Sequence, residues 1–141
     1  MIRQFKGKYN FLSNFYRVKL LIDGKEYATT EHYFQSMKFL DPRIQEQIRT
    51  VSTPAQAKKL AKQNNSEVRK DWFNISLEVM EKALKAKFEI PELKEKLLAT
   101  EDKELQEGNT WNDTFWGVNL KTGKGENHLG KLLMKIRGEL E

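Results

Sequence analysis

The chain of 141 residues contains three prolines, and each stands where a stretch that favours a helix begins. The fixed φ and missing N–H of proline suit the first turn of a helix and break its interior. Helix starts are therefore expected at Pro42, Pro54 and Pro91. The sequence predicts helices over residues 42–51, 54–63 and 91–99.

Apolar spacing predicts three more helices. Thr29 and Thr30 offer an N-cap for a helix over 31–40, which Pro42 ends. Helical periodicity continues over 74–89 and again over 127–139. The three segments place most of their apolar side chains on one side.

The extended segments are few and short. Residues 16–22 and 25–28 flank Asp23-Gly24, a strong hairpin turn, and a short extended piece is expected at 104–106. No repeat or linker interrupts the chain. We therefore expect one α+β domain over 1–141, dominated by helices with a small β-sheet.

The composition excludes several classes of protein. No run of about 18 apolar residues predicts a membrane span, and the N-terminus lacks the apolar stretch of a secretory signal. Absence of cysteine removes disulfides, thiolate nucleophiles and cysteine zinc sites. His32 and His128 share no metal-binding spacing. We expect a cytoplasmic protein with no metal and no cofactor.

The net charge is modestly positive, +5, and one basic cluster is denser than the rest. It comprises Lys58, Lys59, Lys62, Arg69 and Lys70. This cluster fits either a phosphate-bearing partner or a solvated helix face.

A glycine-flanked lysine, Lys124, precedes the last predicted helix. Glycine-rich turns that open into a helix present unpaired N–H groups and the positive end of the helix dipole, which favour a phosphate. The alternative is an ordinary loop in which Asn127 is the N-cap.

Three side chains at spacings i, i+4 and i+7 share one face of the predicted helix over 31–40: Glu31, Gln35 and Lys38. Such a charged stripe, flanked by aromatic residues, suits the wall of a pocket. A common amphipathic helix with Glu31 in its first turn explains the same pattern.

Three other positions allow both a functional and a structural interpretation. Asp113, among aromatic residues, suits a general acid or a turn cap beside the Trp116-Gly117 corner. Asn14 is either a polar contact in an aromatic pocket or a turn residue. Lys87 is a usable amine if it is buried, or extends its ammonium into water.

Several ordered blocks together resemble the NADAR (NAD- and ADP-ribose-associated), or YbiA-like, family, from about Phe11 to Arg137. The blocks are 12–16 (LSNFY), 30–35 (TEHYFQ) with Lys38, Trp72 with Met80, 86–88 (AKF), 97–100 (LLAT), 107–113 (EGNTWND), 116–117 (WG), and 125–130 (GENHLG) with Leu133, Met134 and Arg137.

This resemblance implies an α+β domain that hydrolyses N-glycosidic bonds of phosphorylated ribosylamino-pyrimidine intermediates of riboflavin biosynthesis. Related members remove ADP-ribose from guanine in nucleic acid. A non-catalytic sensor that binds ADP-ribose or NAD is a further alternative. The implied partner is a small phosphorylated N-riboside, with nucleic acid if the substrate is ADP-ribosylated guanine, and no membrane.

The resemblance gives the candidate residues their expected roles. Glu31 stabilises charge at the ribose C1 or activates water, and Asp113 protonates the departing nitrogen. Lys87 or Lys38 could instead form a Schiff base with C1. The expected substrate-binding residues are Asn14, Phe15, Lys38, Trp72, Trp116, Gly117, Lys124 and Asn127.

Overall fold

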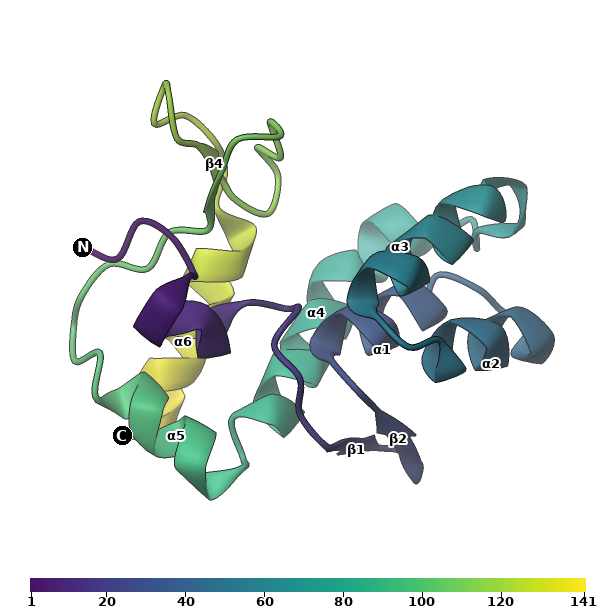
Figure 1. Ribbon diagram of the computed structural model, residues 1–141, viewed down its shortest axis with the longest axis horizontal. Coiled ribbons are helices and arrows are strands. Elements are labelled where there is room, and N and C mark those ends of the chain that lie inside the picture. The colour runs from purple at the N-terminus through teal and green to yellow at the C-terminus, as the bar shows by residue number, and fades with distance from the viewer. The chain divides into compact units, whose positions relative to one another are not determined.

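The computed structural model describes residues 1–141 (Figure 1). Its backbone falls into two compact units: a central unit, Asn14–Lys87, and a terminal unit made of Met1–Ser13 and Phe88–Glu141. Helices dominate and two small two-stranded sheets accompany them, which confirms the expected α+β class. The expectation of one domain over 1–141 stays a prediction. None of the helices is both long and apolar enough to cross a bilayer.

The central unit begins with a β-hairpin and continues through helices (Figure 1). The elements are β1 (Leu20–Ile22), β2 (Lys25–Tyr27), α1 (Thr30–Ser36), α2 (Pro42–Thr50), α3 (Pro54–Gln63), a short 3₁₀ helix (Asn65–Glu67) and α4 (Trp72–Lys87).

The hairpin forms at the predicted turn. Asp23 and Gly24 have φ values of 52° and 80°, and two positive φ angles in a two-residue loop match the twist of the flanking strands. The antiparallel register pairs Leu20 with Tyr27 and Ile22 with Lys25. Leu20, Ile22 and Tyr27 are buried in a core cluster with Tyr33 of α1 and Ala83 of α4, which fixes the hairpin on these helices.

The prolines begin helices as expected, with Pro42, Pro54 and Pro91 in the first turns of α2, α3 and α5 (Pro91–Leu98). Asp41 caps α2 by accepting the Arg43 N–H at 2.9 Å. Thr53 and Gln56 form a reciprocal capping box at α3.

Helix α1 is shorter than predicted, ending at Ser36 instead of residue 40. After it, the Phe39 N–H bonds back to Ser36 O, a tighter spacing than in an α-helix. Phe39 is completely buried in a cluster with Ile48 and Ala61. Burial of this ring against α2 and α3 therefore overrides helical continuation.

The terminal unit contains a 3₁₀ helix (Gly7–Leu12), α5, β3 (Gly108–Asn109), β4 (Val118–Asn119) and α6 (His128–Leu140). Helices α5 and α6 pack together (Figure 1). The extended segment near 105 is confirmed, since Leu105 pairs in parallel with Ile2. The parallel pair β3–β4 was not predicted, because two residues per strand give no alternation to detect.

Candidate functional site

The N-terminus of α1 is held by a hydrogen-bonded cap. Thr29 has extended backbone, and its hydroxyl accepts the His32 N–H at 3.1 Å. All residues of α1 are buried, so this short helix lies inside the protein rather than on its surface.

The fully buried His32 supports this cap, and both of its ring nitrogens have protein partners. Its Nε2 lies 2.9 Å from the Val51 carbonyl oxygen, which can only accept, so Nε2 carries the hydrogen. Nδ1 then accepts from the Thr29 hydroxyl at 2.8 Å. Burial lowers the pKa of His32, which favours this neutral form.

Glu31 and Gln35 form the polar pair at the centre of the candidate site. The Gln35 Nε2 donates to Glu31 Oε2 at 2.8 Å, across one turn of α1. Their exposed fractions are 7% and 4%. The two side chains therefore share a face, as the i, i+4 spacing predicted, and the carboxylate is held in a fixed position away from bulk water.

Asn14 ties the preceding loop to the start of α1. Its Oδ1 accepts the Thr30 hydroxyl at 2.7 Å, and its carbonyl oxygen accepts the Glu31 N–H at 3.2 Å. Asn14 thus orients the first turn of α1, which carries Glu31.

Aromatic rings and Lys38 complete this part of the central unit. The Lys38 Nζ lies 5.7 Å from the Phe34 ring centre, and Phe34 contacts Trp72 edge-on at 5.0 Å. Burial lowers the pKa of Lys38, while the Glu31 charge raises it and Lys58 lowers it further. Phe15, at 45% exposed, presents a ring to solvent.

Lys87, the last residue of α4, is fully buried, so its side chain lies in the core and does not extend its ammonium group into water. Its Nζ lies 5.6 Å from the centre of the Tyr16 ring. Burial lowers the pKa of Lys87 to about 7. Near neutral pH a large fraction of this amine is therefore uncharged and nucleophilic.

In the terminal unit, Asp113 caps the Trp116-Gly117 corner. Its Oδ1 accepts the N–H groups of Phe115 at 3.2 Å and Trp116 at 3.0 Å. Asn109 clamps the Asp113 backbone, with bonds of 2.9 Å to both its N–H and its carbonyl. The structural alternative weighed for Asp113 is therefore realised, and catalysis by Asp113 stays a proposal.

Gly117 is explained by close approach of backbone. A Cβ there would lie 1.9 Å from the Glu107 carbonyl oxygen, so no other residue fits. Trp116 is half-buried and meets the Phe115 ring edge-on at 5.0 Å.

The expectation of unpaired N–H groups before α6 is wrong. The N–H groups of residues 126–129 already donate to the carbonyl oxygens of residues 114, 117, 115 and 116. Asn127, at φ 53°, makes no capping bond to the helix; it accepts the Glu107 N–H at 3.0 Å and donates to Leu105 O at 2.9 Å. Lys124 is exposed, so a phosphate contact there rests on its side chain alone.

The candidate residues thus fall into two sets, each described within its own unit. The central unit holds Asn14, Phe15, Glu31, Lys38, Trp72 and Lys87, and the terminal unit holds Asp113, Trp116, Gly117, Lys124 and Asn127. Sequence reasoning placed Gln35 on the Glu31 face but did not name it as a site residue. Its i+4 spacing from a first-turn acid was the available signal.

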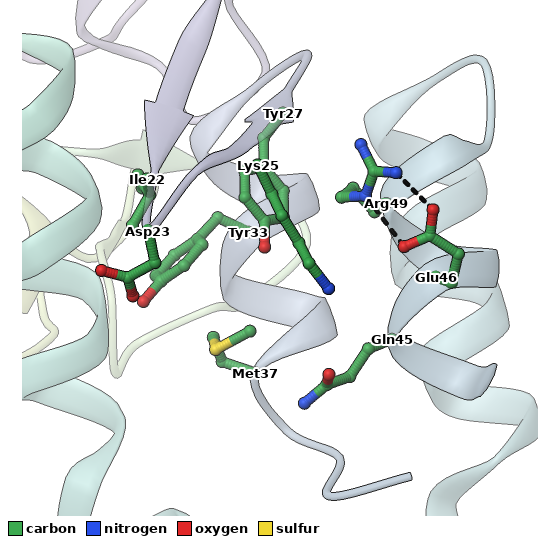
Figure 2. A pocket seen from close by; sticks show the side chains of 9 residues that line it. All are labelled: Ile22, Asp23, Lys25, Tyr27, Tyr33, Met37, Gln45, Glu46 and Arg49. Carbon is green, nitrogen blue, oxygen red and sulfur yellow. Dashed lines mark hydrogen bonds and ion pairs between the residues drawn. The ribbon is translucent and has the colours of Figure 1, made fainter. Parts of the chain in front are cut away.

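A separate small cavity lies between the hairpin, α1 and α2 (Figure 2). Its volume is about 160 Å³, below the range of about 300–1,000 Å³ usual for ligand pockets. Arg49 on its wall is paired with Glu46, and neither Glu31 nor Gln35 lines it. We therefore do not assign substrate to this cavity.

The chain matches known proteins along nearly its whole length. It is 45% identical to the N-glycosidase YbiA of Escherichia coli over 133 residues, covering 94% of this chain and 82% of that protein. It is 36% identical to an N-glycosidase of Nostoc punctiforme, covering 94% and 86%. A riboflavin biosynthesis protein of Vibrio vulnificus is 39% identical, and the match covers 36% of that longer protein.

The solved NMR structure of the Escherichia coli protein YbiA has the same fold. It superposes with a TM-score of 0.89 at 42% identity, over 99% of this chain and 84% of that one. The family model for the NADAR domain matches residues 2–141. With this match and these relatives, the chain belongs to the NADAR domain family.

Proposed function

We propose that this protein is an N-glycosidase that hydrolyses the ribose C1–N bond of phosphorylated ribosylamino-pyrimidines from riboflavin biosynthesis. The names of its N-glycosidase relatives support hydrolysis of an N-glycosyl bond, and that of the Vibrio vulnificus relative supports the pathway. The observation that carries the proposal is the buried Glu31, held by Gln35.

Glu31 fits the electrostatic demand of this reaction. As the C1–N bond breaks, positive charge develops on C1 and the ring oxygen, and a nearby carboxylate stabilises it. Because Glu31 is already fixed by Gln35 and by the loop at Asn14, little reorganisation accompanies the transition state. A general acid protonates the departing nitrogen, and water then adds hydroxyl to C1 while its other proton restores that acid.

Asp113 is the proposed donor of that proton. Its Oδ1 is the oxygen that caps the Trp116 corner, so proton transfer falls to Oδ2. The rings proposed to stack on the base are Phe15 and Trp72 of the central unit, each contributing about 1–3 kcal/mol by analogy with binding of single-stranded nucleic acid; Trp116 is the candidate ring of the terminal unit. Lys124 contacts the phosphate.

A covalent route uses Lys87 or Lys38 in place of direct water attack. A ribosylamine opens to an imine, the neutral lysine amine adds to C1, and the pyrimidine amine leaves with both protons that the lysine nitrogen gives up. Water hydrolyses the lysine imine and releases the sugar phosphate. The lowered pKa of Lys87, caused by burial, supports this lysine as the nucleophile.

Removal of ADP-ribose from guanine in DNA or RNA is the second candidate. Its support is the basic cluster, of which Lys58, Lys59, Lys62 and Lys70 are exposed. Exposed lysines attract a phosphate backbone without reading its sequence.

One substrate panel separates these possibilities. Purified protein is incubated with ribosylamino-pyrimidine phosphates and with ADP-ribosylated oligonucleotides, and release of the aminopyrimidine from the former and of ADP-ribose from the latter is measured. Release from the former supports the proposal, and salt-sensitive release from the latter alone supports the second candidate. Tight calorimetric binding of ADP-ribose without any cleavage contradicts both and indicates a sensor.

A further inference from the structure

The Gln35 side chain has a determined orientation. Its amide lies against Glu31 Oε2 at 2.8 Å, and an ionised carboxylate can only accept hydrogen bonds. Turning the amide over would place two acceptor oxygens against each other. The amide nitrogen therefore faces Glu31, and Oε1 points away from it.

Gln35 Oε1 is a buried acceptor to which no protein group donates a hydrogen bond. Gln35 itself is 4% exposed. Leaving such an acceptor without a donor costs about 1–3 kcal/mol, and buried polar atoms in native proteins almost always have a partner. An orphaned acceptor beside a proposed catalytic carboxylate indicates a donor that arrives with the ligand.

We propose that Gln35 is a specificity residue whose Oε1 accepts a hydrogen bond from the 2′-hydroxyl of the substrate ribose. This inference rests on the proposed function, in which Glu31 acts at C1. The 2′-hydroxyl is the donor on the carbon next to C1, whereas the ring oxygen can only accept. Because the Gln35 amide is hydrogen-bonded to Glu31, which acts at C1, we expect it to lie next to the adjacent carbon, which carries this hydroxyl.

Such a contact also aids the reaction. In glycoside cleavage, hydrogen bonds to the 2-hydroxyl strengthen in the transition state. A site built to pair with a hydroxyl rejects the analogue that lacks it, because its own polar group then stays unsatisfied. Oε1 is covered in the structure, so the hydroxyl reaches it after a small side-chain movement of the kind common at binding sites.

The test is a cycle of two substrates and two proteins. Wild type and Gln35→Met, a swap of similar volume, are assayed with the ribosylamino-pyrimidine phosphate and its 2′-deoxy analogue. Loss of the 2′-hydroxyl also changes the intrinsic reactivity of the C1–N bond. This change is common to both proteins and cancels in the ratio of ratios.

The ratio of kcat/KM for the ribosyl substrate to kcat/KM for the deoxy analogue should be larger in the wild type than in Gln35→Met, by a factor on the order of 10–100. The matched control is Gln47→Met, an exposed glutamine on α2, which should keep the wild-type ratio. Equal ratios in wild type and Gln35→Met overturn the inference and leave the proposed function intact. No cleavage of either substrate by the wild type overturns both.

A second measurement uses the wild type alone and does not depend on folding of the variant. Ribose 5-phosphate, the sugar product, should inhibit at least ~10-fold more strongly than 2-deoxyribose 5-phosphate. Equal inhibition, or inhibition by neither sugar, contradicts a role for the 2′-hydroxyl.

Discussion

The Lys87 Nζ lies 5.6 Å from the centre of the Tyr16 ring, and the Lys87 side chain is fully buried. A ring face near an amine partly compensates the charged form, but burial dominates and lowers its pKa to about 7. The unfolded chain has no such burial, so the two states bind protons differently.

We predict that this difference makes the free energy of unfolding depend on pH in the neutral to alkaline range. Between pH ~7 and ~10.5 the unfolded state holds a proton that folded Lys87 has lost, so the free energy of unfolding rises with pH. This gain in the free energy of unfolding is complete above pH ~10.5, declines as the pH falls, and is fully lost once the pH has fallen through ~7. The slope approaches ~1.4 kcal/mol per pH unit.

Urea denaturation across this pH range checks the slope. Lys87→Met should lack the contribution, whereas Lys85→Met, a change at an exposed lysine on the same helix, should keep it. Equal pH dependence in wild type and Lys87→Met would show that Lys87 does not titrate differently on folding.

Covalent trapping tests the lysine route. If Lys87 or Lys38 forms an imine with C1, borohydride should fix a substrate-dependent sugar adduct on that lysine, and mass spectrometry should locate it. Trapping on Lys87 should increase as pH rises through about 7, because the neutral amine attacks. With active protein and no adduct on either lysine, the covalent route is excluded and direct water attack remains.

Two glycines of α6 should respond in opposite directions to alanine. A Cβ at Gly130 would lie 2.1 Å from the Leu105 carbonyl oxygen, so Gly130→Ala should destabilise the fold by about 2 kcal/mol or more. At Gly138 nothing lies within 4 Å, and Gly138→Ala should stabilise by about 0.5–1 kcal/mol. Thermal unfolding of both variants measures this, and a similar Tm for the two contradicts the described packing of α6.

The cap of α1 should contribute measurable stability. Thr29→Ala removes the acceptor for the His32 N–H and the donor to His32 Nδ1, so we expect a loss of about 1–2 kcal/mol. Thr50→Ala, at an exposed threonine on α2, is the control and should change stability by less than about 0.5 kcal/mol. A loss as small as the control's would mean that the cap is dispensable.

Local signals were sufficient to predict most of the fold. Pro42, Pro54 and Pro91 mark helix starts, and Asp23-Gly24 marks the hairpin, because each depends on the backbone preference of one or two residues. The early end of α1 was missed because it depends on burial of Phe39 against residues distant in sequence.

The candidate site was predictable only in part. Periodicity predicted that Glu31 and Gln35 share a helix face. Neighbouring residue types could not decide whether Lys87 is buried, since that depends on tertiary packing. The N–H groups before α6 looked available in sequence, but carbonyl groups of residues 114–117 occupy them through contacts that leave no sequence motif.

The most direct test of the account is the turnover of Glu31→Gln on a ribosylamino-pyrimidine phosphate. Glutamine keeps the size of the side chain and removes its charge, so turnover should fall by ~10²-fold or more if that charge acts in the transition state. Glu26→Gln, at an exposed glutamate on β2, should retain wild-type turnover. Wild-type turnover in a folded Glu31→Gln protein would contradict the assignment of Glu31 as the catalytic carboxylate.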